Sequence, residues 1–160
     1  MLKWLWLSGL VIVLDQVSKW LMSSWLSLYE TVAVIPFFNL TMAHNTGAAF
    51  SFLAGAGGWQ RWFFVGLAVL ISIGLLIWIQ KLAKTNMEAM SVSLILGGAI
   101  GNVIDRVYFG YVIDFLDVYY GSYHWPAFNI ADSAIVVGTV LLIMDSFRAQ
   151  PKSDTYQGKA

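Results

Sequence analysis

Four long apolar segments occupy most of this 160-residue chain and limit the folds it can adopt. They extend from about Leu2 to Met22, Trp62 to Ile79, Met87 to Val107 and Phe128 to Phe147. About 20 apolar residues in a helix cross the roughly 30 Å hydrocarbon core of a bilayer. Hydrophobic residues make up 59% of the chain and charged residues only 11%, unlike an ordinary soluble domain. The sequence therefore predicts an all-α membrane protein with four transmembrane helices.

These four segments are expected to form one compact unit. The sequence contains no internal repeat, no low-complexity tract and no linker long enough to divide it. Lys3 before an apolar run is typical of a cleavable signal sequence, but Asp15 interrupts the run and no small-residue cleavage site follows. We therefore predict a single membrane domain over residues 1–150 with a retained first span, and a polar cytoplasmic tail over residues 151–160.

The cationic residues predict the orientation of the spans. Cytoplasmic loops of membrane proteins carry an excess of lysine and arginine. Five cations fall on one side if both termini share it: Lys3, Lys81, Lys84, Arg148 and Lys152. Both termini are therefore expected in the cytoplasm, and four aspartates then gather at the outer ends of the spans: Asp15, Asp105, Asp114 and Asp132. Any chemistry is expected to face outward.

Charge and residue usage exclude several function classes. The net charge is zero and the cations are scattered, so the chain has no basic patch for nucleic acid. It has no cysteine, hence no disulfide and no thiolate nucleophile. Its two histidines, His44 and His124, are too few for a His-rich zinc site, and we expect both in loops. We therefore predict no metal, no cofactor and no nucleic-acid partner.

The two outer segments have the patterns of short strands. Residues Thr31 to Met42 are rich in β-branched and aromatic side chains and are interrupted by Pro36. The second outer segment, Tyr108 to Ala127, begins with alternating residues and then becomes crowded with tyrosine and tryptophan, which suit the headgroup layer. We expect a small extracytoplasmic β-rich cradle and loop lying on the membrane.

Asp114 and Asp132 are the candidate catalytic residues. An ionisable side chain next to the hydrocarbon is costly and is a functional-site hypothesis by default. Taken singly, Asp132 is also explained as an N-terminal helix cap, and Asp114, like Asp117, as a residue on the solvated face of a strand. Taken together, two carboxylates that share one proton supply the base that activates water and the acid that protonates a leaving amine. The pair predicts a hydrolase at the membrane surface.

Several amide and charged side chains are expected to support this pair. Asn102 and Arg106 are four residues apart and Asn129 and Asp132 three apart, so each couple shares a helix face, and Asn45 is a further amide donor. Arg106 alone is equally well explained by snorkelling to the interface or by pairing with an aspartate of the first or third span.

Two features of the spans have simpler structural interpretations. Asp15 and Lys19 are spaced as a helical ion pair, which competes closely with a role for Asp15 in the site. Asp105 is expected to have a structural or surface role. Gly97, Gly98 and Gly101 are expected to let a neighbouring helix approach closely.

Five sequence motifs together closely resemble those of the bacterial lipoprotein signal peptidases, the signal peptidase II family. The motifs are Asp15–Lys19, Asn45–Ser51, Gly98–Arg106, Val112–Phe115 and Phe128–Ser133. They occur in the order found in the family and extend over nearly the whole chain. Isoleucine before Asp114 and valine within the Gly98–Arg106 motif are conservative departures.

This resemblance implies an aspartic endopeptidase of the bacterial inner membrane. Such an enzyme removes signal peptides from prolipoproteins just before a diacylglyceryl-modified cysteine, and the cyclic peptide globomycin occupies its substrate site. By motif match Asp114 and Asp132 take the catalytic positions. The residues that match the polar surroundings of the pair are Asp15, Asn45, Asn102, Arg106 and Asn129. The expected partners are prolipoproteins, membrane lipids and globomycin-like peptides.

Three other classes remain open from the residues alone. A proton-coupled transporter also places aspartates within spans, but four short spans without a repeat make a poor transporter unless it oligomerises. A membrane scaffold accounts for the glycines but not for the polar motifs. A metallopeptidase lacks the His-Glu-x-x-His signature.

Overall fold

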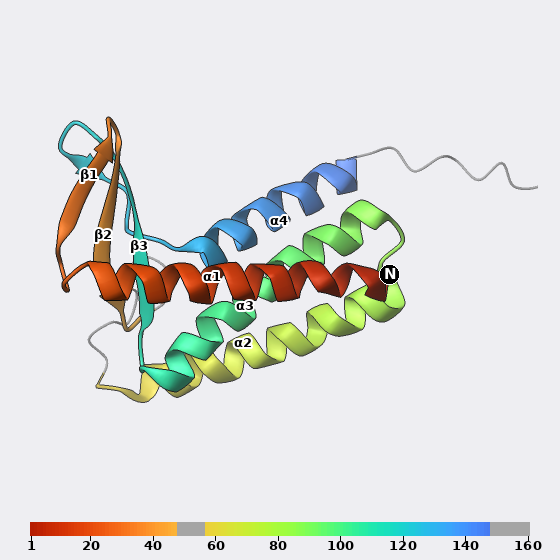
Figure 1. Cartoon of the computed structure of the whole chain (residues 1–160). Coiled ribbons are helices and arrows are strands. Elements are labelled where there is room, and N and C mark those ends of the chain that lie inside the picture. Colours follow the sequence, from red (N-terminus) through yellow and green to blue (C-terminus); the bar gives the residue numbers. More distant parts are fainter. Residues whose placement is uncertain (48–56, 148–160) are drawn as a thin grey trace, which may run out of the picture.

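The computed structural model describes residues 1–47 and 57–147, which form a bundle of four helices with a small sheet at one end (Figure 1). The helices are α1 Leu5–Trp25, α2 Trp59–Ile77, α3 Asn86–Tyr108 and α4 Ile130–Phe147. A 3-10 turn, Leu2–Trp4, precedes α1, and a π-helical turn, Trp78–Leu82, extends α2. Each helix is long and apolar enough to span a membrane, so the expected four-helix membrane fold is confirmed. The predicted tail, residues 151–160, lies outside the described residues.

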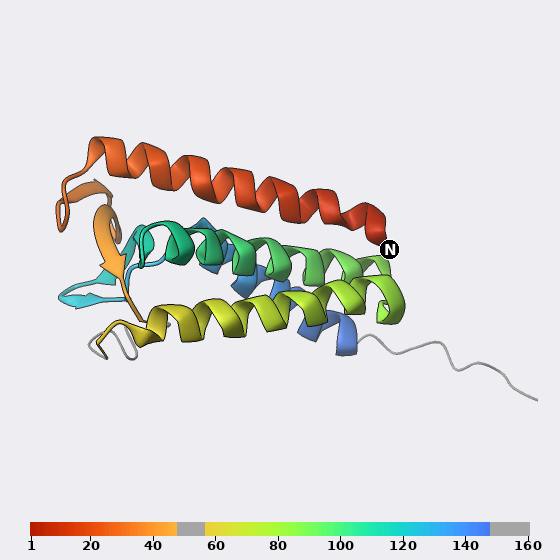
Figure 2. The ribbon, with the colours of Figure 1, turned by 90° about the horizontal axis from the view of Figure 1, so that it is seen from below.

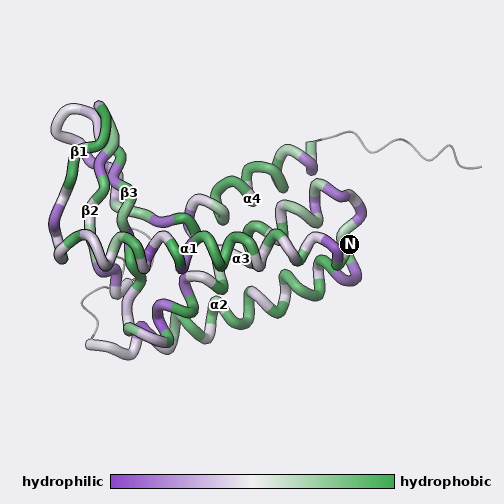
Figure 3. Tube along the Cα trace, in the orientation of Figure 1, coloured by the Kyte–Doolittle hydropathy of each residue, from purple (hydrophilic) through white to green (hydrophobic). Residues whose placement is uncertain are grey.

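The surface of the bundle explains why it needs a bilayer. Large apolar side chains on the outer faces of the helices are well exposed, with Leu70 of α2 at 68% and Val136 of α4 at 61%. A continuous apolar surface of this kind is not stable in water. Figure 3 shows apolar residues along the middle of the helices and polar residues near the helix ends, whereas the sheet is mixed.

Helix α3 is the centre of the bundle. Half of its most apolar stretch is buried, against 17–22% for the other three helices. Figure 2 shows α3 between α1 and α2. Its glycines permit this packing, because a Cβ atom on Gly97 would lie 2.8 Å from the carbonyl oxygen of Ser8 in α1. A Cβ atom on Gly98 would overlap the carbonyl oxygen of Ala131 in α4. The expected close approach of neighbouring helices is therefore confirmed.

The sheet consists of β1 Thr31–Ile35, β2 Phe38–Asn45, β3 Val112–Tyr120 and β4 Tyr123–His124. The strands pair antiparallel in the order β1-β2-β3-β4, which confirms the expected β-rich cradle. Its inner face is attached to the end of α1 through a small core of Leu26, Met42 and Ile113. The two predicted strand regions are therefore present.

The chain path brings β3 beside the start of α4. Gly110, with φ of +88°, turns the chain from α3 into β3, a backbone conformation that favours glycine. After the β3–β4 hairpin, the N–H of Phe128 donates to the carbonyl oxygen of Leu116 at 3.0 Å, which ties the approach to α4 onto β3. The middle of β3 and the first turn of α4 are therefore neighbours, and each carries one of the candidate aspartates.

Candidate active site

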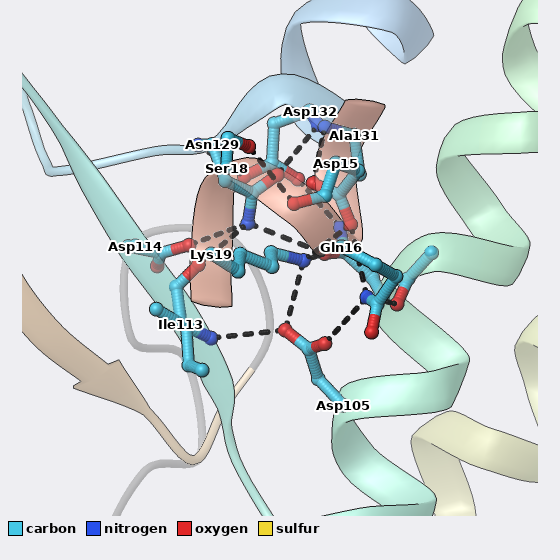
Figure 4. Close-up of polar contacts among 12 residues, drawn as sticks. Asp15, Gln16, Ser18, Lys19, Asp105, Ile113, Asp114, Asn129, Ala131 and Asp132 are labelled. Atoms are coloured by element: carbon cyan, nitrogen blue, oxygen red, sulfur yellow. Dashed lines mark hydrogen bonds and ion pairs between the residues drawn. The ribbon is translucent and has the colours of Figure 1, made fainter. Parts of the chain in front are cut away.

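Asp114 lies in β3 with its carboxylate enclosed by amides. Its side chain is only 3% exposed. Oδ1 accepts a hydrogen bond from Nδ2 of Asn129 at 2.7 Å, and Oδ2 accepts one from Nδ2 of Asn45 in β2 at 3.1 Å. Figure 4 shows Asp114 on β3 facing Asn129, which precedes α4. Asp114 therefore lies in the interior of the site and not on the solvated face of a strand.

Asp132 lies in the first turn of α4, where it takes part in capping the helix and also contacts α3. Its N–H donates to Oδ1 of Asn129 at 2.9 Å, and its Oδ2 accepts from the N–H of Asn129 at 3.3 Å. This reciprocal arrangement is a capping box, so the expected capping interaction is present. Its other oxygen, Oδ1, accepts from Nδ2 of Asn102 in α3 at 2.8 Å. Capping thus engages one carboxylate oxygen while the other faces α3.

Two asparagine side chains connect the two carboxylates. Asn129 is fully buried and donates from Nδ2 to Asp114 and, at 3.2 Å, to Oδ1 of Asn102. Asn102 in turn donates from Nδ2 to Asp132. Asp114 and Asp132 are therefore held in one hydrogen-bond network, and their described donors are all amides.

Behind these amides lies a buried ion cluster on α1 and α3. Nζ of Lys19, which is 2% exposed, lies 2.8 Å from Oδ2 of Asp15 and 2.8 Å from Oδ2 of Asp105 (Figure 4). It also donates to Oδ1 of Asn102 at 3.0 Å. The expected helical pair of Asp15 and Lys19 is therefore confirmed. Asp15 additionally accepts from the N–H of Ala131 in α4 at 2.9 Å, so it supports the site from behind.

Asp105 is a structural residue of this cluster and does not lie on the surface. It is fully buried and accepts from Nε2 of Gln16 at 2.8 Å and from the N–H of Ile113 at 3.1 Å. Lys19 and Gln16 are polar neighbours of the site that were not predicted from the sequence. The spacing of Asp15 and Lys19 was a signal for part of this cluster, whereas the contact of Lys19 with Asp105 depends on how α1 packs against α3.

Arg106 lies at the edge of the same site on α3. Its Nη2 donates to the carbonyl oxygen of Gly47 at 2.8 Å, and its Nη1 donates to the carbonyl oxygen of Asn102 at 3.3 Å. Its guanidinium lies over the ring of Phe64 in α2, 5.5 Å from the centroid. Lys19, and not Arg106, pairs with Asp15 and Asp105. The part of the Asn45–Ser51 motif from residue 48 onward lies outside the described residues.

An open cavity of about 690 Å³ gives access to the carboxylates. Five of the seven predicted site residues line it: Asn45, Asn102, Arg106, Asp114 and Asp132. Asn129 is buried beneath the cavity, and Asp15 lies behind it. One wall is formed by Trp125–Phe128, and another by apolar residues of α4 that include Val136 and Val137. Both valines are more than half exposed, so the cavity opens toward the bilayer.

Burial and the neighbouring carboxylate make Asp114 a weak acid. Loss of water contact is the larger cause and the charge of Asp132 the second, and together they raise the pKa of Asp114 from 3.8 to about 7. The hydrogen bonds from Asn45 and Asn129 act in the opposite direction but do not compensate. Near neutral pH the two carboxyl groups therefore share one proton. The group that is not protonated is available as a base. Among the described residues, no three His, Asp or Glu side chains are grouped so that they could hold a metal ion.

Comparisons with known proteins identify the family. The family model described as signal peptidase (SPase) II matches residues 7–148. A lipoprotein signal peptidase of Alteromonas mediterranea is 52% identical over 98% of this chain and 87% of that protein. One from Acinetobacter baumannii is 53% identical over 95% of this chain and 89% of that protein.

Solved structures agree with this family. A bacterial membrane enzyme solved by the in meso method at 2.3 Å resolution superposes with a TM-score of 0.84 and is 31% identical, covering all of this chain and 95% of that chain. A second, solved by the same method at 1.9 Å resolution, has a TM-score of 0.81 and 34% identity over 94% of this chain and 96% of that one. The match of the family model, the identity to its members and the shared fold show that this chain belongs to the signal peptidase II family.

Proposed function

We propose that this chain cleaves diacylglyceryl-modified prolipoproteins just before the lipid-modified cysteine, and that Asp114 and Asp132 activate the attacking water. Membership of the family shows that the chain is an aspartic protease of the signal peptidase II type and a multi-pass protein of the bacterial inner membrane. The proposed roles of Asp114 and Asp132 are supported by one observation: their carboxylates line one cavity and are linked through Asn102 and Asn129.

The proton inventory of the pair matches the needs of peptide hydrolysis. One carboxylate takes a proton from the water while the water oxygen bonds to the scissile carbonyl carbon. The protonated carboxyl group donates its proton to the carbonyl oxygen. When the carbon–nitrogen bond breaks, the protonated carboxyl group gives its proton to the leaving amine. The other carboxylate takes a proton from a hydroxyl of the tetrahedral intermediate as the carbonyl group of the new carboxylic acid forms, so the pair again holds one proton. Asn102 and Asn129 keep both carboxylates in place during these transfers, because each carboxylate is fixed by at least one of these amides.

The shape of the cavity suits a lipid-modified substrate. Its α4 wall carries Val136 and Val137, whose exposed side chains face hydrocarbon, so acyl chains can remain in the bilayer while the peptide enters. The polar residues of the cavity come from β2, β3, the last two turns of α3 and the first turn of α4. These segments meet at the sheet end of the bundle (Figure 1). A globomycin-like cyclic peptide is expected to compete for this same space, because it would meet the carboxylates that hold the scissile bond.

The orientation follows from the charges at the other end of the bundle. Lys3, Lys81 and Lys84 flank the helices at the end opposite the sheet, where the N-terminus also lies (Figure 1). This distribution supports a topology in which both termini are cytoplasmic and the sheet and the dyad lie at the outer face. Labelling of an engineered cysteine at Tyr123 by a membrane-impermeant maleimide in intact cells would support this orientation, whereas protection of that cysteine would contradict it.

The decisive experiment uses purified protein and a diacylglyceryl-modified prolipoprotein in detergent or lipid. Release of the signal peptide is followed on a gel, and the new amino terminus is identified by mass spectrometry. Wild type is expected to cleave just before the modified cysteine, and Asp114→Asn and Asp132→Asn to remain folded without cleaving. Asp145→Asn, at the other end of α4, is the matched control and is expected to cleave normally. Cleavage by either dyad variant at the wild-type rate would refute the assignment.

A further inference from the structure

A further buried carboxylate, Asp117, lies in β3 and does not line the catalytic cavity. Its place in an amphipathic strand predicts a position on the solvated face, but Asp117 is only 6% exposed. Its Oδ2 accepts a hydrogen bond from Nδ2 of Asn39, the residue directly opposite in β2, at 2.8 Å. Asp117 and Asp114 are three residues apart on a strand and therefore point to opposite faces of the sheet. The mechanism proposed above does not use this buried charge.

His124 provides the second partner of Asp117. It lies in β4 and not in a loop as expected, and its Nδ1 is 2.9 Å from Oδ1 and 3.0 Å from Oδ2 of Asp117. Because a carboxylate only accepts, Nδ1 carries the proton of this contact. The imidazole also stacks on Tyr119 with the ring centroids 5.2 Å apart. One face of the ring is thus packed and one nitrogen is fixed, although the side chain is 53% exposed.

The residues that follow His124 form a wall of the catalytic cavity. Trp125–Phe128 lines this cavity together with Asp114 and Asp132. The backbone of the wall is held to β3 at its two ends, where Trp125 donates to Val118 at 2.8 Å and Phe128 donates to Leu116 at 3.0 Å. Pro126 has no N–H with which to add a further bond.

The strand that introduces this wall is weak by itself. β4 has only two residues, Tyr123 and His124, which pair with Tyr120 and Tyr119. Such a short ladder contributes little to the stability of β4. A side-chain contact at the end of β4 therefore has a large share in holding the strand in place. The contact of His124 with Asp117 is charge-assisted and reaches a buried carboxylate, which makes it stronger than a neutral surface hydrogen bond.

We propose that His124 is a positioning residue for the substrate: through Asp117 it fixes the Trp125–Phe128 wall against which the signal peptide binds. This inference rests on the proposed function, because it takes the cavity to be the peptide site. His124 itself is not among the residues that line the cavity, so its effect on the substrate would pass through the wall. Its loss should therefore weaken substrate binding and leave the chemical step intact.

Three substitutions of His124 separate this role from a general structural one. The amide nitrogen of Asn occupies nearly the position of Nδ1, so His124→Asn keeps a donor for Asp117. His124→Gln places its amide near the position of Nε2, where Asp117 is out of reach, and His124→Ala removes the donor. Tyr123→Ala, at the exposed neighbouring residue, is the matched control.

The variants are compared by steady-state cleavage of the modified prolipoprotein in detergent and by hydrogen exchange without substrate. For His124→Ala and His124→Gln we expect KM and the exchange rate of amides 120–128 to rise about threefold to tenfold, as for loss of a partly exposed charge-assisted hydrogen bond. We expect kcat to stay within about twofold of wild type, and His124→Asn and Tyr123→Ala to behave like wild type.

Other results would contradict either the role of His124 or the proposed function, and the two cases can be distinguished. Unchanged exchange and unchanged KM in His124→Ala, with normal wild-type cleavage, would overturn the role of His124 and leave the proposed function intact. An equal defect in His124→Asn and His124→Ala would also overturn it, because the donor at the Nδ1 position would then not matter. A wild type that cleaves no prolipoprotein would overturn the proposed function itself, and the exchange comparison would still decide whether His124 fixes the wall.

Discussion

Replacing Asp114 by asparagine should abolish cleavage and yet stabilise the protein at alkaline pH. The native pKa of about 7 is far above the ordinary 3.8, so the folded chain keeps this proton over a range in which the unfolded chain has released it. Where the native state binds more protons, stability falls as pH rises. The decrease is about 1.4 kcal/mol for each pH unit between about pH 4 and pH 7, or about 4 kcal/mol in all.

Asparagine removes this penalty but has a cost of its own. Asp114 accepts amide hydrogen bonds on both oxygens, from Asn129 and Asn45, whereas an asparagine side chain has only one oxygen. The unmatched amide costs about 1–3 kcal/mol at every pH. Asp114→Asn should therefore be less stable than wild type at pH 4 by about 1–3 kcal/mol, and more stable at pH 8 by a similar amount. The difference between the two proteins changes sign with pH.

The measurement is reversible unfolding in mixed detergent micelles at several pH values. The eight tryptophans provide a fluorescence signal. Thr139→Ala, a neutral change on α4, is the control, and its curve against pH should run parallel to that of wild type. A difference between Asp114→Asn and wild type that stays constant from pH 4 to pH 8 would refute the reasoning, because Asp114 would then not hold its proton in the folded state.

Three further perturbations test other parts of the site. Lys19→Met leaves the carboxylates of Asp15 and Asp105 buried without their shared cation and should destabilise the protein by about 3–5 kcal/mol, measured by the same unfolding assay; adding Asp105→Asn should recover part of this loss. Gly98→Val places side-chain atoms where the backbone of Ala131 lies and should lower stability by about 1–3 kcal/mol or prevent folding, and a variant as stable as wild type would contradict the packing. Cleavage should be unaffected by EDTA, since the proposed mechanism uses carboxylates alone, and inhibition reversed by added zinc would contradict it.

The fold follows from the sequence to the extent that local patterns determine it. The length and apolarity of the segments predicted four spans, and the largest difference at a boundary is three residues, as at Trp25 against the expected Met22. Alternating and β-branched residues predicted strands in both outer segments. What these patterns do not contain is the register between elements. Asp117 reads as a solvated residue along its own strand and is buried because Asn39 and His124 cover it from the neighbouring strands.

The candidate site was predictable in a similar, partial way. Spacing within one helix indicated the pair of Asp15 and Lys19 and the shared face of Asn129 and Asp132, both of which the structure contains. The approach of Lys19 to Asp105 joins α1 to α3 and has no signal within either helix. The motif match grouped the dyad with its surroundings, but the arrangement of amides in front and an ion cluster behind requires the packed bundle.

That arrangement gives a physical reason why two of the four outer aspartates suit acid–base chemistry. Asp15 and Asp105 each contact the ammonium of Lys19 at 2.8 Å. The described hydrogen-bond donors to Asp114 and Asp132 are amides, which orient a carboxylate without neutralising it. Within residues 1–47 and 57–147, neither carboxylate has a cation in contact, and both have lost much of their hydration. Two such neighbouring carboxylates avoid ionising together, so the pair retains a proton near neutral pH. The partner of each aspartate thus separates structural carboxylates from those able to exchange a proton with substrate, on grounds independent of the family.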